Sequence, residues 1–225
     1  MSGGPRGDGI RPRPLSRDRQ GREAGRGADG GIVRVEAPER EGADFYPTPR
    51  EPVLALLDAE MERLRDFTTI WEPACGDGAM ARIIEAAGFD VEATDLHDRG
   101  YGRQGNFFAI RAGLAPAIIT NPPYQEVNWR DGRGRWITHA LDVLGVEYMA
   151  LLLSWSWPGA GGLAPVWAAH PPARVYLMRW KIDFTGQGAP PMLNGWFVWD
   201  RAWRGETVLR MLDRVADWRQ AGLGL

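Results

Sequence analysis

The sequence predicts an α/β protein with a mainly parallel, doubly wound sheet and one antiparallel strand near the C-terminus. Short apolar segments that suit buried strands alternate with helical segments through the middle of the chain. Alternation of this kind is typical of strand–helix–strand units, which build parallel sheets with helices on both faces. At 225 residues, 44% of them hydrophobic, the chain has room for one such domain with a sizeable core.

The elements follow in order from about Phe45. Thr48-Pro49-Arg50-Glu51 predicts a helix start, with Thr48 as the cap and Glu51 completing a capping box. Strands are expected over 68–71, 90–94, 117–120, 148–153, 174–179 and 196–199. Helices are expected over 79–87, over 137–144 and, at the end of the chain, over about 205–221.

Residues 1–42 form a separate region on composition, and residues 43–225 form the predicted domain. The N-terminal region is rich in Gly, Arg and Pro and nearly free of large apolar residues, which predicts a disordered arm. Its arginines could hold nucleic acid loosely, or the arm is a solvated tail. Because the whole chain has a formal net charge of -2, any contact with nucleic acid has to come from a local basic patch.

Composition also limits the compartment and the kind of chemistry. Cys75 is the single cysteine, so no internal disulfide can form, which fits a reducing compartment such as the cytoplasm of a bacterial or phage-infected cell. No apolar run reaches the length of a membrane span. His97, His139 and His170 have no metal-ligand spacing with one another or with Cys75, so we expect no metal site.

A glycine-containing turn, Glu72-Pro73-Ala74-Cys75-Gly76-Asp77-Gly78, follows the first expected strand. It lacks the glycine spacing of a dinucleotide fingerprint and the Gly-Lys-Ser/Thr of a P-loop. The carboxylate of Glu72 suits an ammonium group rather than a pyrophosphate. Asp95 ends the second strand about 20 residues further on, the usual place for an acidic side chain that accepts hydrogen bonds from ribose hydroxyls. An ammonium group with a ribose describes S-adenosylmethionine better than a nicotinamide dinucleotide.

Asn121-Pro122-Pro123-Tyr124 follows the apolar strand 117–120 and indicates a catalytic turn. An exocyclic amino nitrogen is a poor nucleophile because its lone pair is delocalised into the ring. The Asn121 side-chain oxygen and the Pro122 carbonyl can accept its two N–H hydrogens and draw the nitrogen towards tetrahedral geometry. The prolines stiffen the turn, and Tyr124 offers a flat face for stacking. A base in a duplex has to be flipped out to reach such a turn.

These motifs together resemble S-adenosylmethionine-dependent amino-methyltransferases. The turn 72–78 is similar to their first motif, and 121–124 is similar to their catalytic motif. Phe45-Tyr46-Pro47-Thr48-Pro49 resembles the N-terminal cofactor-binding segment of a sub-class of DNA adenine methyltransferases, so the whole resembles the small DNA N6-adenine methyltransferases of phages. The resemblance implies a Rossmann-like methyltransferase fold, S-adenosylmethionine as cofactor, and adenine N6 in DNA as the methyl acceptor.

The resemblance also implies roles for individual residues. Tyr46 and Thr48 would touch the methionine part of the cofactor, Glu72 would face its ammonium group, and Asp95 would hold the ribose. Gly105-Asn106-Phe107-Phe108 resembles the motif where the cofactor adenine binds, although many relatives have Asp at the position of Asn106. Phe107 packs either on that adenine or in the core. The remaining expected cofactor-binding residues are Ala74, Gly76 and Gly78.

The segment 129–136 places three arginines between two tryptophans, directly after the catalytic turn. Arg130, Arg133 and Arg135 could hold DNA phosphates, or the segment is a solvated loop with a buried Trp136. Other acceptors use the same activation: cytosine N4, guanine N2 in ribosomal RNA, and a glutamine amide in a protein. A non-catalytic cofactor-binding module is the alternative from a different class.

Overall fold

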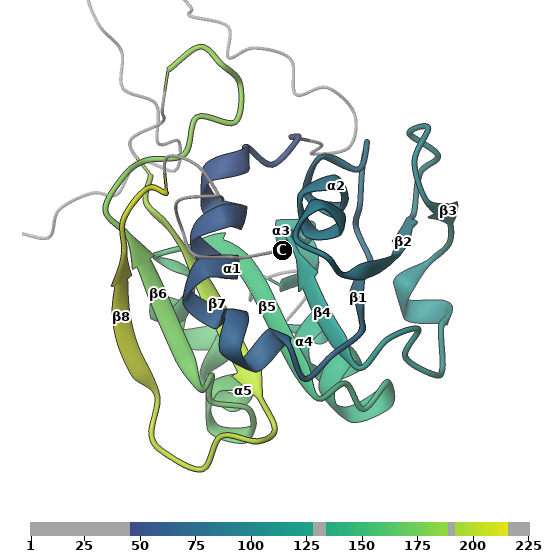
Figure 1. Cartoon of the computed structure of the whole chain (residues 1–225). Coiled ribbons are helices and arrows are strands. Elements are labelled where there is room, and N and C mark those ends of the chain that lie inside the picture. Colours follow the sequence, from purple (N-terminus) through teal and green to yellow (C-terminus); the bar gives the residue numbers. More distant parts are fainter. Residues whose placement is uncertain (1–45, 128–133, 189–191, 216–225) are drawn as a thin grey trace, which may run out of the picture. The chain divides into compact units, whose positions relative to one another are not determined.

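The computed structural model describes residues 46–127, 134–188 and 192–215. The arm predicted over 1–42 lies outside the described residues. Within the described part, eight strands form one sheet in the order β3-β2-β1-β4-β5-β7-β6-β8 (Figure 1). The strands are β1 (Thr69–Glu72), β2 (Asp90–Asp95), β3 (Arg103–Gln104), β4 (Ala117–Thr120), β5 (Tyr148–Ser154), β6 (Arg174–Met178), β7 (Asn194–Asp200) and β8 (Val208–Leu212).

The predicted mixed sheet is confirmed, with β7 as the antiparallel strand near the C-terminus. The pairs from β3 to β5 are parallel, β7 runs antiparallel to both β5 and β6, and β6 pairs with β8 in parallel. The chain crosses from β1 to β2 through α2 (Ala79–Ala86), which follows the glycine turn. The carboxyl ends of β1, β2 and β4 therefore meet at one edge of the sheet, where ligands bind in open α/β folds.

Helices cover both faces of the sheet, as expected for a doubly wound fold (Figure 1). One hydrophobic cluster contains Leu56 of α1 (Arg50–Leu64) and Ile84 of α2. The other contains residues of α4 (Arg135–Thr138), of the π-helix that continues it over His139–Val143, and of α5 (Ala164–Ala169). Successive side chains of β5 alternate between the two clusters, as the period of a strand requires. α3 (Tyr124–Val127) begins within the catalytic turn.

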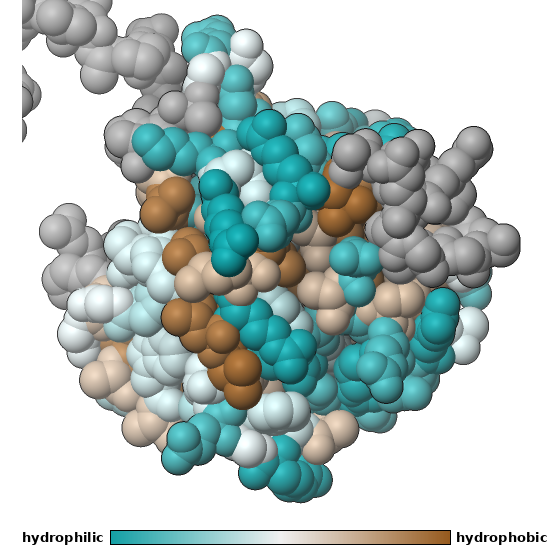
Figure 2. All heavy atoms as spheres, turned by 60° about the vertical axis from the view of Figure 1, so that its left-hand side comes forward, coloured by the Kyte–Doolittle hydropathy of each residue, from teal (hydrophilic) through white to brown (hydrophobic). Residues whose placement is uncertain are grey.

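Two expectations about local structure are wrong. The C-terminal segment forms the edge strand β8 rather than a helix, because its backbone pairs with β6 from Arg174↔Val208 to Met178↔Leu212. The run Val208-Leu209-Arg210-Met211-Leu212 suits a helix or a strand on apolar spacing alone, and the open edge of β6 decides between them. Figure 2 turns this side of the molecule forward and shows hydrophobic surface on it. Leu209 and Met211 of β8 are exposed.

The second wrong expectation concerns the start of α1. Thr48 does not cap the helix: the helix begins one residue later, Pro49 is its N-cap, and no side chain caps it. The Thr48 hydroxyl instead accepts a hydrogen bond from the side chain of Asn121. The Thr48 hydroxyl therefore pairs with a residue 73 positions away in the sequence instead of with the backbone of α1. Sequence spacing does not show a contact of this kind.

A buried carboxylate fixes α1 on the sheet. Glu60 of α1 is 3% exposed and accepts hydrogen bonds from Arg174 Nε at 2.6 Å and Nη2 at 2.8 Å. The hydroxyls of Tyr148 and Tyr176 donate to the same carboxylate. Burial and the neighbouring Glu60 raise the pKa of both phenols, which therefore stay neutral donors.

A second acid completes this network. Asp200 of β7 accepts from Arg174 Nη2 at 2.9 Å and from Arg63 Nε at 3.1 Å. Burial raises the pKa of Asp200, but the hydrogen bonds from Arg174, the Ala202 amide and Arg63 outweigh it and leave the pKa below its ordinary value. The network thus joins α1 to β5, β6 and β7.

Removal of the arginine is expected to destabilise the fold strongly. Arg174→Met leaves the Glu60 carboxylate buried without its cation, which costs about 3–5 kcal/mol of unfolding free energy. Arg179→Met is the matched control, because Arg179 pairs with Asp213 on the surface, and should cost less than about 1 kcal/mol. Urea unfolding of both variants measures the difference, and equal losses would contradict the assigned importance of the buried pair.

Candidate functional site

A cavity of about 670 Å³ lies at the carboxyl ends of β1, β2 and β4. Its wall also includes the segment before α1 and the loop between β6 and β7. The size lies within the range of small-molecule sites, which is about 300–1,000 Å³. Segments far apart in the sequence, from Tyr46 to Met192, thus build one cavity.

Most of the predicted site residues line this cavity. They are Tyr46, Thr48, Glu72, Ala74, Asp95, Asn106, Phe107, Asn121, Pro122, Pro123, Tyr124 and Arg135. Gly76 and Gly78 are not among the lining residues. They belong to the backbone of the turn 72–78. Gly78 has φ of 82°, and a Cβ on it would lie 2.4 Å from the ring of Tyr101. Arg130 and Arg133 lie outside the described residues.

Glu72 ends β1 with a buried and unsatisfied carboxylate. The residue is 2% exposed, and its Oε2 has no hydrogen-bond partner among the residues that the structure describes. Burial raises the pKa of Glu72 well above its ordinary value, while a hydrogen bond with the Ala81 backbone acts in the opposite direction. A buried carboxylate that lacks a partner is costly by itself and suits a cationic ligand in the cavity.

Asp95 ends β2 and is bound into the glycine turn. Its Oδ2 accepts from the Gly76 amide and its Oδ1 from the His97 amide, both at 2.9 Å. These bonds fix the carboxylate where the turn and the strand end meet. A carboxylate has about four acceptor positions, so capacity remains for hydroxyl groups of a ligand.

The Asn121 amide is oriented by Thr48. Asn121 Nδ2 donates to Thr48 Oγ1 at 3.2 Å, and Asn121 Oδ1 is buried without a partner in the described part of the chain. Since the nitrogen is held by the hydroxyl, the oxygen is the atom left free to accept a hydrogen bond. The site therefore contains a preoriented acceptor at the start of the catalytic turn.

Tyr124, at the other end of the turn, is held by a residue that the sequence did not indicate. Its hydroxyl accepts from Asn194 Nδ2 at 3.1 Å, and Asn194 begins β7. Burial raises the pKa of Tyr124 to about 12, and the hydrogen bond from Asn194 acts in the opposite direction. The phenol is therefore neutral at physiological pH.

Residues 106–108 are held by several contacts within the protein. Asn106 Oδ1 accepts from the Phe108 amide at 2.9 Å and caps the 3-10 helix Phe107–Ala109. Phe107 is 4% exposed and stacks on Trp136 with ring centroids 4.1 Å apart. His139, whose pKa burial lowers, donates from Nε2 to the Phe107 carbonyl. Phe107 thus belongs to the core and also lines the cavity.

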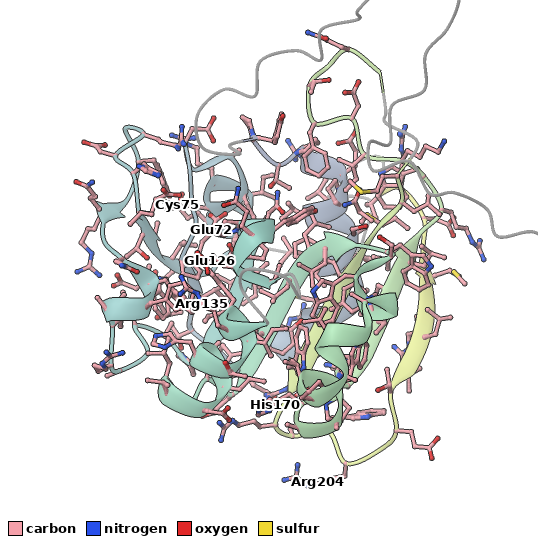
Figure 3. All side chains as sticks on the ribbon, turned by 180° about the vertical axis from the view of Figure 1, so that it is seen from behind. Glu72, Cys75, Glu126, Arg135, His170 and Arg204 are labelled. Carbon is pink, nitrogen blue, oxygen red and sulfur yellow. The ribbon has the colours of Figure 1, made fainter. Side chains whose placement is uncertain are left out.

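Arg135 lies at the rim of the cavity with partners of its own. Its guanidinium forms an ion pair with Glu126 and lies 4.1 Å from the ring centroid of Phe108. A phosphate that binds Arg135 has to compete with Glu126. Figure 3 shows Glu72, Cys75, Glu126 and Arg135 in one region of the molecule, with His170 well apart from them.

Cys75 is a buried thiol beside the turn. It is 4% exposed, and its Sγ lies 3.5 Å from the Tyr101 carbonyl. Burial, with the negative charges of Glu72 and Asp95, raises the pKa of Cys75 to about 12. A thiol of this kind is not poised as a nucleophile.

The loop between β6 and β7 contributes lining residues, among them Phe184, Thr185 and Met192. The place of the segment 184–191 between the last two predicted strands favours a position near the cavity. Asp183 braces this loop by accepting hydrogen bonds from the amides of Thr185, Gly186 and Gly188. An Asp followed by glycines is the available signal for such a turn, but it does not show which cavity the loop reaches.

Comparison with known proteins supports the fold. No protein-family model matches the sequence, and no curated protein matches it. A protein from Listeria monocytogenes, described as a class I S-adenosylmethionine-dependent methyltransferase, superposes with a TM-score of 0.53 at 13% identity, covering 76% of this chain and 67% of its own. One from Pyrococcus horikoshii, described as an RNA methyltransferase, gives 0.55 at 10% identity, with coverages of 70% and 86%.

At these identities the likeness is one of fold. The chain has the Rossmann-like α/β fold of class I S-adenosylmethionine-dependent methyltransferases. In the part of the chain that the structure describes, no helix is long and apolar enough to cross a membrane.

Proposed function

We propose that the protein binds S-adenosylmethionine and transfers its methyl group to the N6 amino group of adenine in DNA, after the base is flipped out of the helix. One observation carries the proposal: the buried, unpartnered oxygen of Asn121 lies in the same cavity as the buried, unpartnered oxygen of Glu72. The first suits an amino group to be activated, and the second suits the ammonium group of the cofactor.

The cavity residues fit this cofactor. Glu72 would face the ammonium group, Asp95 would accept from the ribose hydroxyls, and Tyr46 and Thr48 would contact the methionine part. Asn106 and Phe107 would border the adenine ring. When bound, the cofactor would supply an electrophilic methyl group on a sulfonium, and the electron pair of the S–C bond that breaks on transfer would stay on the sulfur as a neutral thioether.

The catalytic turn would activate the acceptor by hydrogen bonding. Asn121 Oδ1 and the Pro122 carbonyl accept the two N–H hydrogens of the amino group, so its lone pair is withdrawn from the ring and becomes available for a bond to carbon. Pro122 and Pro123 keep both acceptors in place, which lowers the cost of orienting them. Once the new N–C bond forms, the nitrogen carries a positive charge and loses one proton to water.

We choose adenine over the other acceptors because of the motif resemblance. The amino-methyltransferases that act on cytosine usually begin the tetrapeptide with Ser, whereas those that act on adenine begin it with Asn or Asp, as Asn121 does here. Cytosine N4, guanine N2 in RNA and a protein glutamine amide present the same planar nitrogen and are the competing acceptors. Arg130, Arg133 and Arg135 would contact the DNA backbone.

Transfer of a labelled methyl group identifies the acceptor. The protein is incubated with the labelled cofactor and, separately, with unmethylated DNA, with ribosomal RNA and with a protein mixture. We expect label in DNA and, after digestion to nucleosides, in N6-methyladenine. Detection of N4-methylcytosine instead would change the proposed acceptor to cytosine and leave the proposed mechanism unchanged. Cofactor binding without any labelled acceptor would indicate a binding module instead of an enzyme.

Removing the free amide oxygen should stop catalysis but not cofactor binding. Asn121→Ala is expected to lower turnover by about a hundredfold or more, as when one prepositioned polar group is deleted from an active site. Asn121→Asp keeps an acceptor oxygen and is the matched control, so it should retain more activity. Turnover is measured by methyl transfer and affinity by calorimetry. Near-normal turnover of the alanine variant would exclude this mechanism.

Thr48 is expected to act on turnover through Asn121. Thr48→Val keeps the shape but removes the hydroxyl that accepts from Asn121 Nδ2, so the amide can rotate and turnover should fall by roughly tenfold, the size of one lost hydrogen bond of about 1.4 kcal/mol. Thr48→Ser retains the hydroxyl and should stay within about twofold of the wild type by the same reasoning. If both variants lose activity equally, the methyl group of Thr48 and not its hydroxyl matters.

Cofactor binding should release a proton from Glu72. In the unliganded protein, burial raises the pKa of this carboxyl, so its stabilising contribution is greatest at low pH and is lost as pH rises through that raised pKa. A bound ammonium group favours the ionised form, so affinity should increase as pH rises above the ordinary value of 4.5. Calorimetry in buffers of different ionisation enthalpy detects the proton, and Glu72→Gln should abolish its release. Release that persists in Glu72→Gln would assign the proton elsewhere.

A further inference from the structure

Asn194 is a buried polar residue that takes no part in the mechanism as derived so far. It is 0% exposed and begins β7, opposite Ser154 of β5. Its Nδ2 lies 3.1 Å from the Tyr124 hydroxyl and 3.5 Å from the Leu153 carbonyl. Since a carbonyl can only accept, the nitrogen has to face Leu153, which fixes the orientation of the amide and makes the Tyr124 hydroxyl an acceptor.

The amide is not explained by the stability of the sheet. Within the described ranges 46–127, 134–188 and 192–215, Asn194 Oδ1 is buried and has no hydrogen-bond partner, so the side chain leaves one polar atom unsatisfied there. An unsatisfied buried acceptor destabilises a fold, and an apolar side chain of similar size would avoid that cost. The presence of an amide at this position therefore requires another explanation.

Its position connects two walls of the cavity. Tyr124 belongs to the catalytic turn, and Met192, two residues before Asn194, lines the cavity from the loop between β6 and β7. The hydrogen bond from Asn194 thus ties the tyrosine to the strand that follows this loop. This bond holds the outer end of the Tyr124 side chain and so restricts its rotation about Cα–Cβ, although the ring can still rotate about Cβ–Cγ because the hydroxyl lies on that axis.

We propose that Asn194 is a positioning residue that holds the Tyr124 side chain in one rotamer about Cα–Cβ, and through it the position of the ring on which the planar acceptor stacks. The inference rests on the proposed function for its effect on the acceptor, but its effect on the ring does not depend on any ligand. Asn194 touches neither the cofactor nor the reacting nitrogen. Its influence on methyl transfer has to pass through the Tyr124 hydroxyl.

The orientation of the ring is tested without cofactor or acceptor. The chain has five tyrosines, so fluorotyrosine labelling gives a simple fluorine NMR spectrum, and the Tyr124 signal is the one lost in Tyr124→Phe. In the wild type we expect the signal of a tyrosine whose side chain is held in one rotamer. Asn194→Leu should broaden or average that signal, whereas Leu193→Ala, a neighbouring and exposed control, should leave it unchanged. An unaltered Tyr124 signal in Asn194→Leu would overturn the proposal.

The consequence for the acceptor is tested by a double-mutant cycle. Asn194→Leu is expected to raise the acceptor KM by roughly tenfold, as for one lost hydrogen bond, with cofactor affinity unchanged. In a Tyr124→Phe background, where the partner hydroxyl is already gone, the same substitution should change KM by less than about twofold. Equal effects in both backgrounds would show that Asn194 acts through the sheet, which contradicts the proposal.

Folding is checked separately. Asn194→Leu combined with Tyr124→Phe removes both hydrogen-bonding groups and should melt at or above the wild-type temperature. If Asn194→Leu alone does not fold, Tyr124→Phe tests the same bond from the other side and should itself raise the acceptor KM. An unchanged KM in that variant overturns the proposal. Absence of methyl transfer by the wild type would remove the proposed function but not the NMR result.

Discussion

The buried carboxylate of Glu60 determines where α1 lies, and the cavity depends on the place of α1. A carboxylate with Arg174, Tyr148 and Tyr176 around it is satisfied only in one arrangement of helix and strands, because each partner comes from a different position on the sheet. The indole of Trp196 adds a hydrogen bond to the Pro52 carbonyl near the start of the same helix. The residues just before α1 are thereby directed to the carboxyl end of β4, where Thr48 meets Asn121.

This arrangement explains why the catalytic turn does not depend on local structure alone. A tetrapeptide after a strand has several accessible side-chain conformations, and two prolines restrict only its backbone. The side chains at its two ends are each held from elsewhere: Asn121 by Thr48, ahead of α1, and Tyr124 by Asn194, at the start of β7. The site therefore depends on the segments that lie beside the turn in the fold. The tetrapeptide alone does not fix the orientation of its two terminal side chains.

The sequence predicted the parts of the site that are local. Glu72, Asp95 and Asn121 each end or follow a short apolar strand, and parallel strands bring their carboxyl ends to the same edge, so their convergence follows from the order of elements. Asn194 and Tyr124 are 70 residues apart, and Glu60 and Arg174 are 114 apart. Neither pair has a spacing signal, because such contacts arise from the packing of whole elements. The strand β8 was missed for the same reason: its apolar residues fit a helix equally well, and its partner strand β6 is distant in sequence.

For the chemistry that we propose, fixed positions of the acceptor oxygens matter more than the basicity of any side chain. Asn121 is uncharged at any pH at which the protein is folded, so it can accept a hydrogen bond but cannot take up the proton that methylation releases. It does not need to, because a ring amino nitrogen that has gained a methyl group while keeping both hydrogens is a strong acid and loses a proton to water. The barrier lies earlier, in withdrawing the lone pair from the ring, and two acceptors achieve that only if their directions are fixed before the base arrives. An amide oxygen held by Thr48 and a ring held by Asn194 supply that fixed geometry, and this is consistent with two buried amides whose oxygens lack partners within the described residues.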